Sequence, residues 1–195
     1  MRMPIYMAAV VAFVSVANAH AQEATEEKLS IDWDSAKAAA VADAQRDQSG
    51  VEKFRAAVPS GLEKVRVPVL VTGTGPVRAA PQVKAQDTSY AAIYLLDRDA
   101  TLSIMGTALS IVVTGGDATP ADVPDYQAGD FTILDDDADA KSASQPMEAD
   151  YSFFKFGAAY TLRLSCKQQG DKRCLEPDFA KSVASSLVQV GGSPE

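Results

Sequence analysis

The feature that most constrains the fold of this chain is an alternation of apolar and polar residues over several segments of its middle and last thirds. Along residues 160–166, one face of an extended strand is apolar and carries Tyr160, Leu162, Leu164 and Cys166. The intervening positions are polar, so this segment predicts a strand with one buried face. Similar patterns predict further strands over residues 65–71, 90–96, 101–105, 108–114, 131–134 and 151–156. We therefore expect an antiparallel β-sheet of about five to seven strands.

Helical patterns flank this sheet-forming region. Residues 32–48 are rich in alanine, a strong helix former, and predict the first helix. A capping-box pattern predicts a second short helix that ends before Pro59. Near the C-terminus, Pro177 precedes apolar residues at four-residue steps, which predicts a closing helix that ends at residues 191–192. The chain is thus expected to form a single α+β domain over residues 32–195, with helices on one face of the sheet.

The N-terminus predicts export. Residues 1–21 have a short basic start, an apolar centre and small residues at alternate positions, which is typical of a secretory signal peptide with cleavage after Ala19 or Ala21. The apolar stretch is shorter than the roughly 20 residues that a membrane-spanning helix needs, so we expect no stable membrane insertion after cleavage. The mature chain is expected in the periplasm or outside the cell, and residues 22–31 are expected to form a flexible acidic leader.

The two cysteines of the chain, Cys166 and Cys174, predict a disulfide bond. An even number of cysteines in an exported chain is typical of such bridges. This bridge would join the end of the strand over residues 160–166 to the start of the closing helix. Redox-active pairs usually have the closer Cys-x-x-Cys spacing, so we interpret the bridge as structural.

Residue usage excludes several kinds of catalysis. The single histidine, His20, lies in the expected signal region. Histidine-based catalytic triads and histidine-ligated zinc or haem sites are therefore excluded, whereas carboxylate, lysine or tyrosine chemistry remains open. The glycine-rich run over residues 72–76 lacks the Gly-Lys-Ser/Thr that completes a phosphate-binding loop. We assign no catalytic, cofactor-binding or metal-binding residue and expect no cofactor.

The net charge of −8 is concentrated in one segment. Residues 117–150 contain ten acidic residues and one basic residue, whereas the rest of the expected mature chain is balanced. An acidic chain is a poor partner for nucleic acid. The densest acidic group is a candidate interaction surface for a cationic partner and consists of Asp135, Asp136, Asp137 and Asp139. This group lacks the glycine and glutamate of an EF-hand loop, although a looser calcium site stays open.

These observations favour a non-enzymatic binding or interaction protein. The pattern looks like that of small exported proteins of bacterial envelopes, so envelope maintenance is one expected role and the partner would be a protein or another envelope component. One alternative is an inhibitor or docking partner of a basic hydrolase, which the acidic segment 117–150 would contact. Another is a carboxylate-based glycan-acting enzyme, for which Asp150 beside Tyr151 is a candidate acid.

Overall fold

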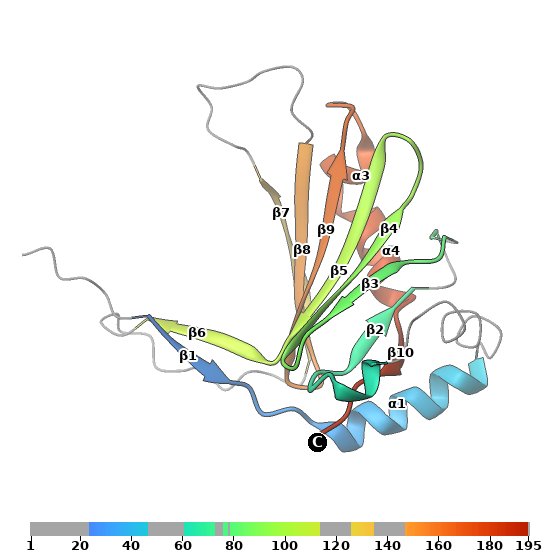
Figure 1. Cartoon of the computed structure of the whole chain (residues 1–195). Coiled ribbons are helices and arrows are strands. Elements are labelled where there is room, and N and C mark those ends of the chain that lie inside the picture. The colour runs from blue at the N-terminus through green and yellow to red at the C-terminus, as the bar shows by residue number, and fades with distance from the viewer. Residues whose placement is uncertain are drawn as a thin grey trace, which may run out of the picture.

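The centre of the fold is a six-stranded antiparallel sheet with the strand order β3-β4-β5-β9-β8-β7 (Figure 1). The computed structural model describes residues 24–46, 61–72, 76–77, 79–113, 126–134 and 147–194. The sheet consists of β3 (Gln82–Ala85), β4 (Ser89–Leu95), β5 (Ala100–Thr107), β7 (Tyr126–Leu134), β8 (Met147–Lys155) and β9 (Ala158–Cys166). This arrangement confirms the expected α+β class and the antiparallel sheet of five to seven strands.

Two smaller antiparallel sheets and the helices complete the described fold. The remaining strands are β1 (Ala24–Lys28), which pairs with β6 (Leu109–Val113), and β2 (Val69–Val71), which pairs with β10 (Val188–Gly191). The helical elements are α1 (Trp33–Arg46), the short 3-10 helix η1 (Leu62–Lys64), α3 (Lys172–Leu175) and α4 (Pro177–Ser185). In Figure 1, α3, α4 and β2 lie on one side of the main sheet, and β1 and β6 form a ribbon that projects from its base.

The main sheet buries one face only. Burial alternates residue by residue along β5 and β9, as the pleat of a strand requires. Leu102 and Ile104 on β5 and Leu162 and Leu164 on β9 are fully buried, and they pack in one core with β2, β10 and α4. The residues between them are half-buried. We call this second face of the sheet the open face.

Three tyrosines connect the sheet to β2 through the core. The Tyr90 hydroxyl donates to the carbonyl oxygen of Leu70 and accepts from its N–H, both at 2.8 Å. The Tyr94 hydroxyl accepts from the N–H of Thr72 at 3.1 Å, and the Tyr160 hydroxyl donates to the carbonyl oxygen of Pro68 at 2.8 Å. Side-chain hydroxyls thus satisfy buried backbone groups that β10 does not reach.

Gly106 makes this tyrosine arrangement possible. It lies on the buried face of β5, opposite Tyr90 on β4 and Tyr160 on β9. A Cβ at this position would lie 2.5 Å from Cε1 of Tyr90 and 2.9 Å from Cε1 of Tyr160. Both rings therefore cross the β5 backbone where there is no side chain.

Some sequence-based expectations need correction. Residues 24–28, expected in the flexible leader, form β1, because β6 supplies backbone partners that the acidic sequence pattern does not reveal. The strand expected over residues 65–71 is limited to Val69–Val71. The closing helix ends at Ser185, because Val188 and the residues after it pair with β2 instead of continuing the helix. The expected signal peptide and second helix lie outside the described residues.

Candidate functional site

The side chains of the open face form rows that cross the strands. Antiparallel pairing places Lys84 opposite Ala91, Ala91 opposite Met105, and Met105 opposite Thr161. A second row, adjacent to the first, contains Ser89, Thr107 and Ala159. Cross-strand neighbours on one face lie close enough to act together. Residues distant in the sequence therefore share one surface.

A groove of about 340 Å³ lies along these two rows. It is lined by Lys84, Gln86, Ser89, Tyr90, Ala91, Met105, Gly106, Thr107, Ala159 and Thr161. Most of the lining surface is apolar, and Lys84 is the only charged residue in it. Small side chains such as Ala91 and Ala159 line part of the groove and leave it hollow. A volume of this size is at the lower end of the range for small-molecule sites.

An ion pair lies beside the groove on the same face. Asp150 on β8 is opposite Arg163 on β9, and Arg163 donates from Nε and Nη2 to the two carboxylate oxygens of Asp150, both at 2.8 Å. The Asp150 carboxylate raises the pKa of Arg163. Asp150, the candidate acid of the glycan-enzyme alternative, is therefore held as the acceptor of a bidentate ion pair.

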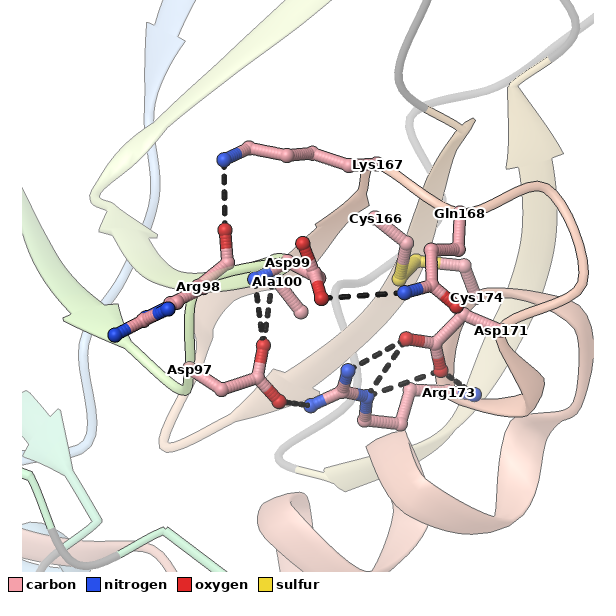
Figure 2. Close-up of polar contacts among 10 residues, drawn as sticks. All are labelled: Asp97, Arg98, Asp99, Ala100, Cys166, Lys167, Gln168, Asp171, Arg173 and Cys174. Carbon is pink, nitrogen blue, oxygen red and sulfur yellow. Dashed lines mark hydrogen bonds and ion pairs between the residues drawn. A yellow bond between two sulfur atoms is a disulfide. The ribbon is translucent and has the colours of Figure 1, made fainter.

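A second polar cluster surrounds the disulfide at the other end of the sheet (Figure 2). Cys166 and Cys174 are bonded, with their Cα atoms 6.3 Å apart, which confirms the predicted bridge. Arg173, next to Cys174, lies between two carboxylates: Nη1 donates to Asp97 at 2.6 Å, and Nη2 donates to Asp171 at 2.5 Å. The cluster thus connects the disulfide loop to the β4–β5 turn.

Further contacts attach the disulfide loop to the same turn. The Lys167 ammonium donates to the carbonyl oxygen of Arg98 at 2.7 Å, and the Gln168 amide donates to Asp99 at 3.2 Å. Asp97 also accepts from the N–H groups of Asp99 and Ala100, which closes the turn. Figure 2 shows these residues facing one another across the gap between turn and loop. We interpret this cluster as structural, because it attaches the disulfide loop to the β4–β5 turn. We call it the latch, and it consists of Asp97, Arg98, Asp99, Lys167, Gln168, Asp171 and Arg173.

The electrostatics of the latch do not suit acid catalysis. Hydrogen bonds from Arg173 lower the pKa of both Asp97 and Asp171. A general acid near neutral pH needs a carboxyl group with a raised pKa. The lowered pKa values of Asp97 and Asp171 therefore do not suit this role. The tyrosines of the core offer no nucleophile either, because burial raises the pKa of Tyr90, Tyr94 and Tyr160.

The structure tests only part of the predicted site. The disulfide residues Cys166 and Cys174 meet as expected. The candidate interaction surface at Asp135, Asp136, Asp137 and Asp139 lies outside the described residues. The groove was not predicted from the sequence. Its one sequence signal was the small and polar residues at alternate positions of the strands, such as Thr161, and these indicate only the less buried face.

Comparison with protein-family models, with curated proteins and with solved structures finds no match to this chain. Within the described residues, no helix is long and apolar enough to cross a membrane. In the same part of the chain, no group of three or more histidine, cysteine, aspartate or glutamate residues is placed to hold a metal ion. Among the described features, the groove is therefore the candidate functional site.

Proposed function

We propose that this chain is an exported, non-enzymatic binding protein of the bacterial envelope that holds a small, largely apolar ligand on its open face. The observation that carries this proposal is the groove of about 340 Å³, with its mainly apolar lining on a surface that faces solvent. Apolar surface in contact with water is unfavourable in free energy, and a ligand that covers the surface removes this penalty. The disulfide supports an oxidising compartment, such as the periplasm or the extracellular space.

The alternatives receive less support from the described residues. The glycan-enzyme alternative needs a carboxyl group with a raised pKa, whereas Asp97 and Asp171 have lowered values and Asp150 is paired with Arg163. The inhibitor alternative depends on the acidic segment 117–150, of which residues 117–125 and 135–146 lie outside the described part, so it stays a prediction.

Binding in the groove can be tested by NMR with isotopically labelled protein and 1-octanol as an uncharged probe. We expect amide shifts confined to residues 84–91, 105–107 and 159–161. The variant Ala159→Phe fills the groove and should abolish these shifts. Ser165→Phe adds the same ring to the same face of β9 outside the groove and should leave them intact. Shifts scattered over the surface, or unaffected by Ala159→Phe, would contradict the proposal.

A further inference from the structure

The open face carries its charges unevenly. On the β7 and β8 side lie Asp130, Glu148 and Asp150, and the cation nearest to them, Arg163, is bound to Asp150. Lys84 lies on β3, at the opposite edge of the sheet. From β3 to β8 there are four strand spacings, about 19 Å, which exceeds the screening length at physiological salt. The acidic side of the face therefore does not neutralise Lys84.

Lys84 is the unpaired cation of the groove. It is exposed, and it forms no ion pair with any residue in the described part of the chain. The nearest acid in the sequence, Asp87, is bound to Arg66 at 2.9 Å. A positive charge without a partner at the edge of an apolar groove complements a negatively charged group on the molecule that fills it.

The polarity of the groove changes along its length. At the β3 end, Lys84 and Gln86 make the groove charged and polar, whereas Ala91, Met105 and Ala159 carry an apolar lining across β4 and β5 to β9. The two threonines of this lining have hydroxyls that already form hydrogen bonds within the protein, Thr107 with the N–H of Leu109 and Thr161 with Ser152. The strands from β3 to β9 span three spacings, about 14 Å. The groove thus has the length and the polarity of a short amphipathic chain with one charged end.

We propose that the ligand class of this groove is a medium-chain carboxylate. Its carboxylate accepts hydrogen bonds from the Lys84 ammonium, and its hydrocarbon chain lies over Ala91 and Met105 toward Ala159. This inference rests on the proposed function, because it names the ligand of the same groove. A neutral chain of equal length gains the apolar contacts without the ion pair, and a cationic chain is repelled at the β3 end.

Three probes with the same hydrocarbon tail separate the contribution of the ion pair from that of the apolar contacts. They are octanoate, 1-octanol and octyltrimethylammonium. Their dissociation constants are measured by NMR titration at low and high salt. Lys84 is exposed, so we expect octanoate to bind about two- to five-fold more tightly than 1-octanol at low salt. High salt should reduce this preference. Octyltrimethylammonium should bind most weakly.

Variants test whether Lys84 causes the preference for octanoate. Lys84→Gln should remove the preference for octanoate, and Lys84→Glu should reverse it in favour of octyltrimethylammonium. Lys181→Gln removes an exposed lysine of α4 outside the groove and should leave all three affinities unchanged. A thermal unfolding curve for each variant confirms that it is folded.

The outcomes distinguish this inference from the proposed function. If 1-octanol shifts the groove residues but octanoate binds no better, or if Lys84→Gln keeps the preference, the carboxylate assignment is wrong and the groove remains a binding site. If Ala159→Phe leaves the binding of every probe unchanged, the groove is not the site, and both proposals are overturned.

Discussion

The two faces of the main sheet are built by the same strands, yet they have opposite characters. Along β9, Leu162 is fully buried, whereas its neighbour Thr161 is half-buried and lines the groove. A step of one residue therefore changes a core position into a surface position. The comparison predicts that substitutions on the open face can alter the proposed ligand binding without altering stability, because the groove and the core are lined by alternate residues.

The faces also differ in how they use polar groups. On the buried face, the hydroxyls of Tyr90, Tyr94 and Tyr160 bond to the backbone of the β2 region. On the open face, the polar side chains form pairs across the strands, such as Ser152 with Thr161 at 3.2 Å. Polar groups inside the core must be satisfied by the protein, whereas those of the open face have water as an alternative partner.

The largest contrast is expected from two neighbouring truncations on β9. Leu162→Ala removes a fully buried side chain and should lower the free energy of unfolding by about 2–5 kcal/mol, through lost burial and a new cavity. Thr161→Ala should change it by less than about 0.5 kcal/mol. Urea unfolding of both variants measures the difference. Equal losses would show that the open face is buried in solution.

Removing the disulfide should have the next largest effect. Cys166 and Cys174 are eight residues apart, and closing a loop of this length stabilises a protein by about 2.5 kcal/mol. We expect the double variant Cys166→Ala/Cys174→Ala to lose this amount in urea unfolding. Its groove should still bind 1-octanol, because the bridge is at the buried face. A stability equal to that of the wild type would contradict the structural role.

Local sequence patterns predicted a large part of the buried architecture. The alternation over residues 160–166, the polar turn after Leu96 and the two cysteines each indicate a structure that forms within one short segment. The structure confirms β9, the β4–β5 hairpin and the bridge. The strands could be predicted because a pleated strand with one buried face has a period of two residues. The bridge could be predicted because the chain contains only two cysteines.

Other features depend on pairing between distant segments. β10 follows a helix directly, and Leu187 continues the helical spacing, so the sequence gives no sign that Val188 starts a strand. The groove requires β5 to lie beside β9, which brings Met105 opposite Thr161. The alternation in a single sequence predicts which residues of a strand share a face, but it does not predict the order of the strands in the sheet. The groove depends on that order.

The hydroxyl groups of the core tyrosines should contribute less to stability than the apolar core side chains. Tyr90→Phe leaves both the N–H and the carbonyl of Leu70 without their hydroxyl partner, and we expect a loss of about 1–3 kcal/mol. Tyr160→Phe affects only the carbonyl of Pro68 and should cost less. Guanidinium unfolding of the two variants tests this ranking. The reverse order would mean that the Tyr90 hydroxyl adds little to the stability of β2.

The smallest effect is expected at the latch, and it should depend on pH. Arg173 lowers the pKa of Asp97 and Asp171 below the ordinary value of 3.8 in the folded state. Their stabilisation is therefore complete above about pH 4 and is lost as the pH falls through the lowered values, because the unfolded chain binds protons first. We expect the melting temperature of Arg173→Gln to fall less steeply than that of the wild type below this pH. Lys181→Gln is the control for loss of one positive charge. Parallel acid profiles for Arg173→Gln and the wild type would show that the latch adds no stability, and the contrast between the two faces would then depend on apolar burial and the core hydrogen bonds alone.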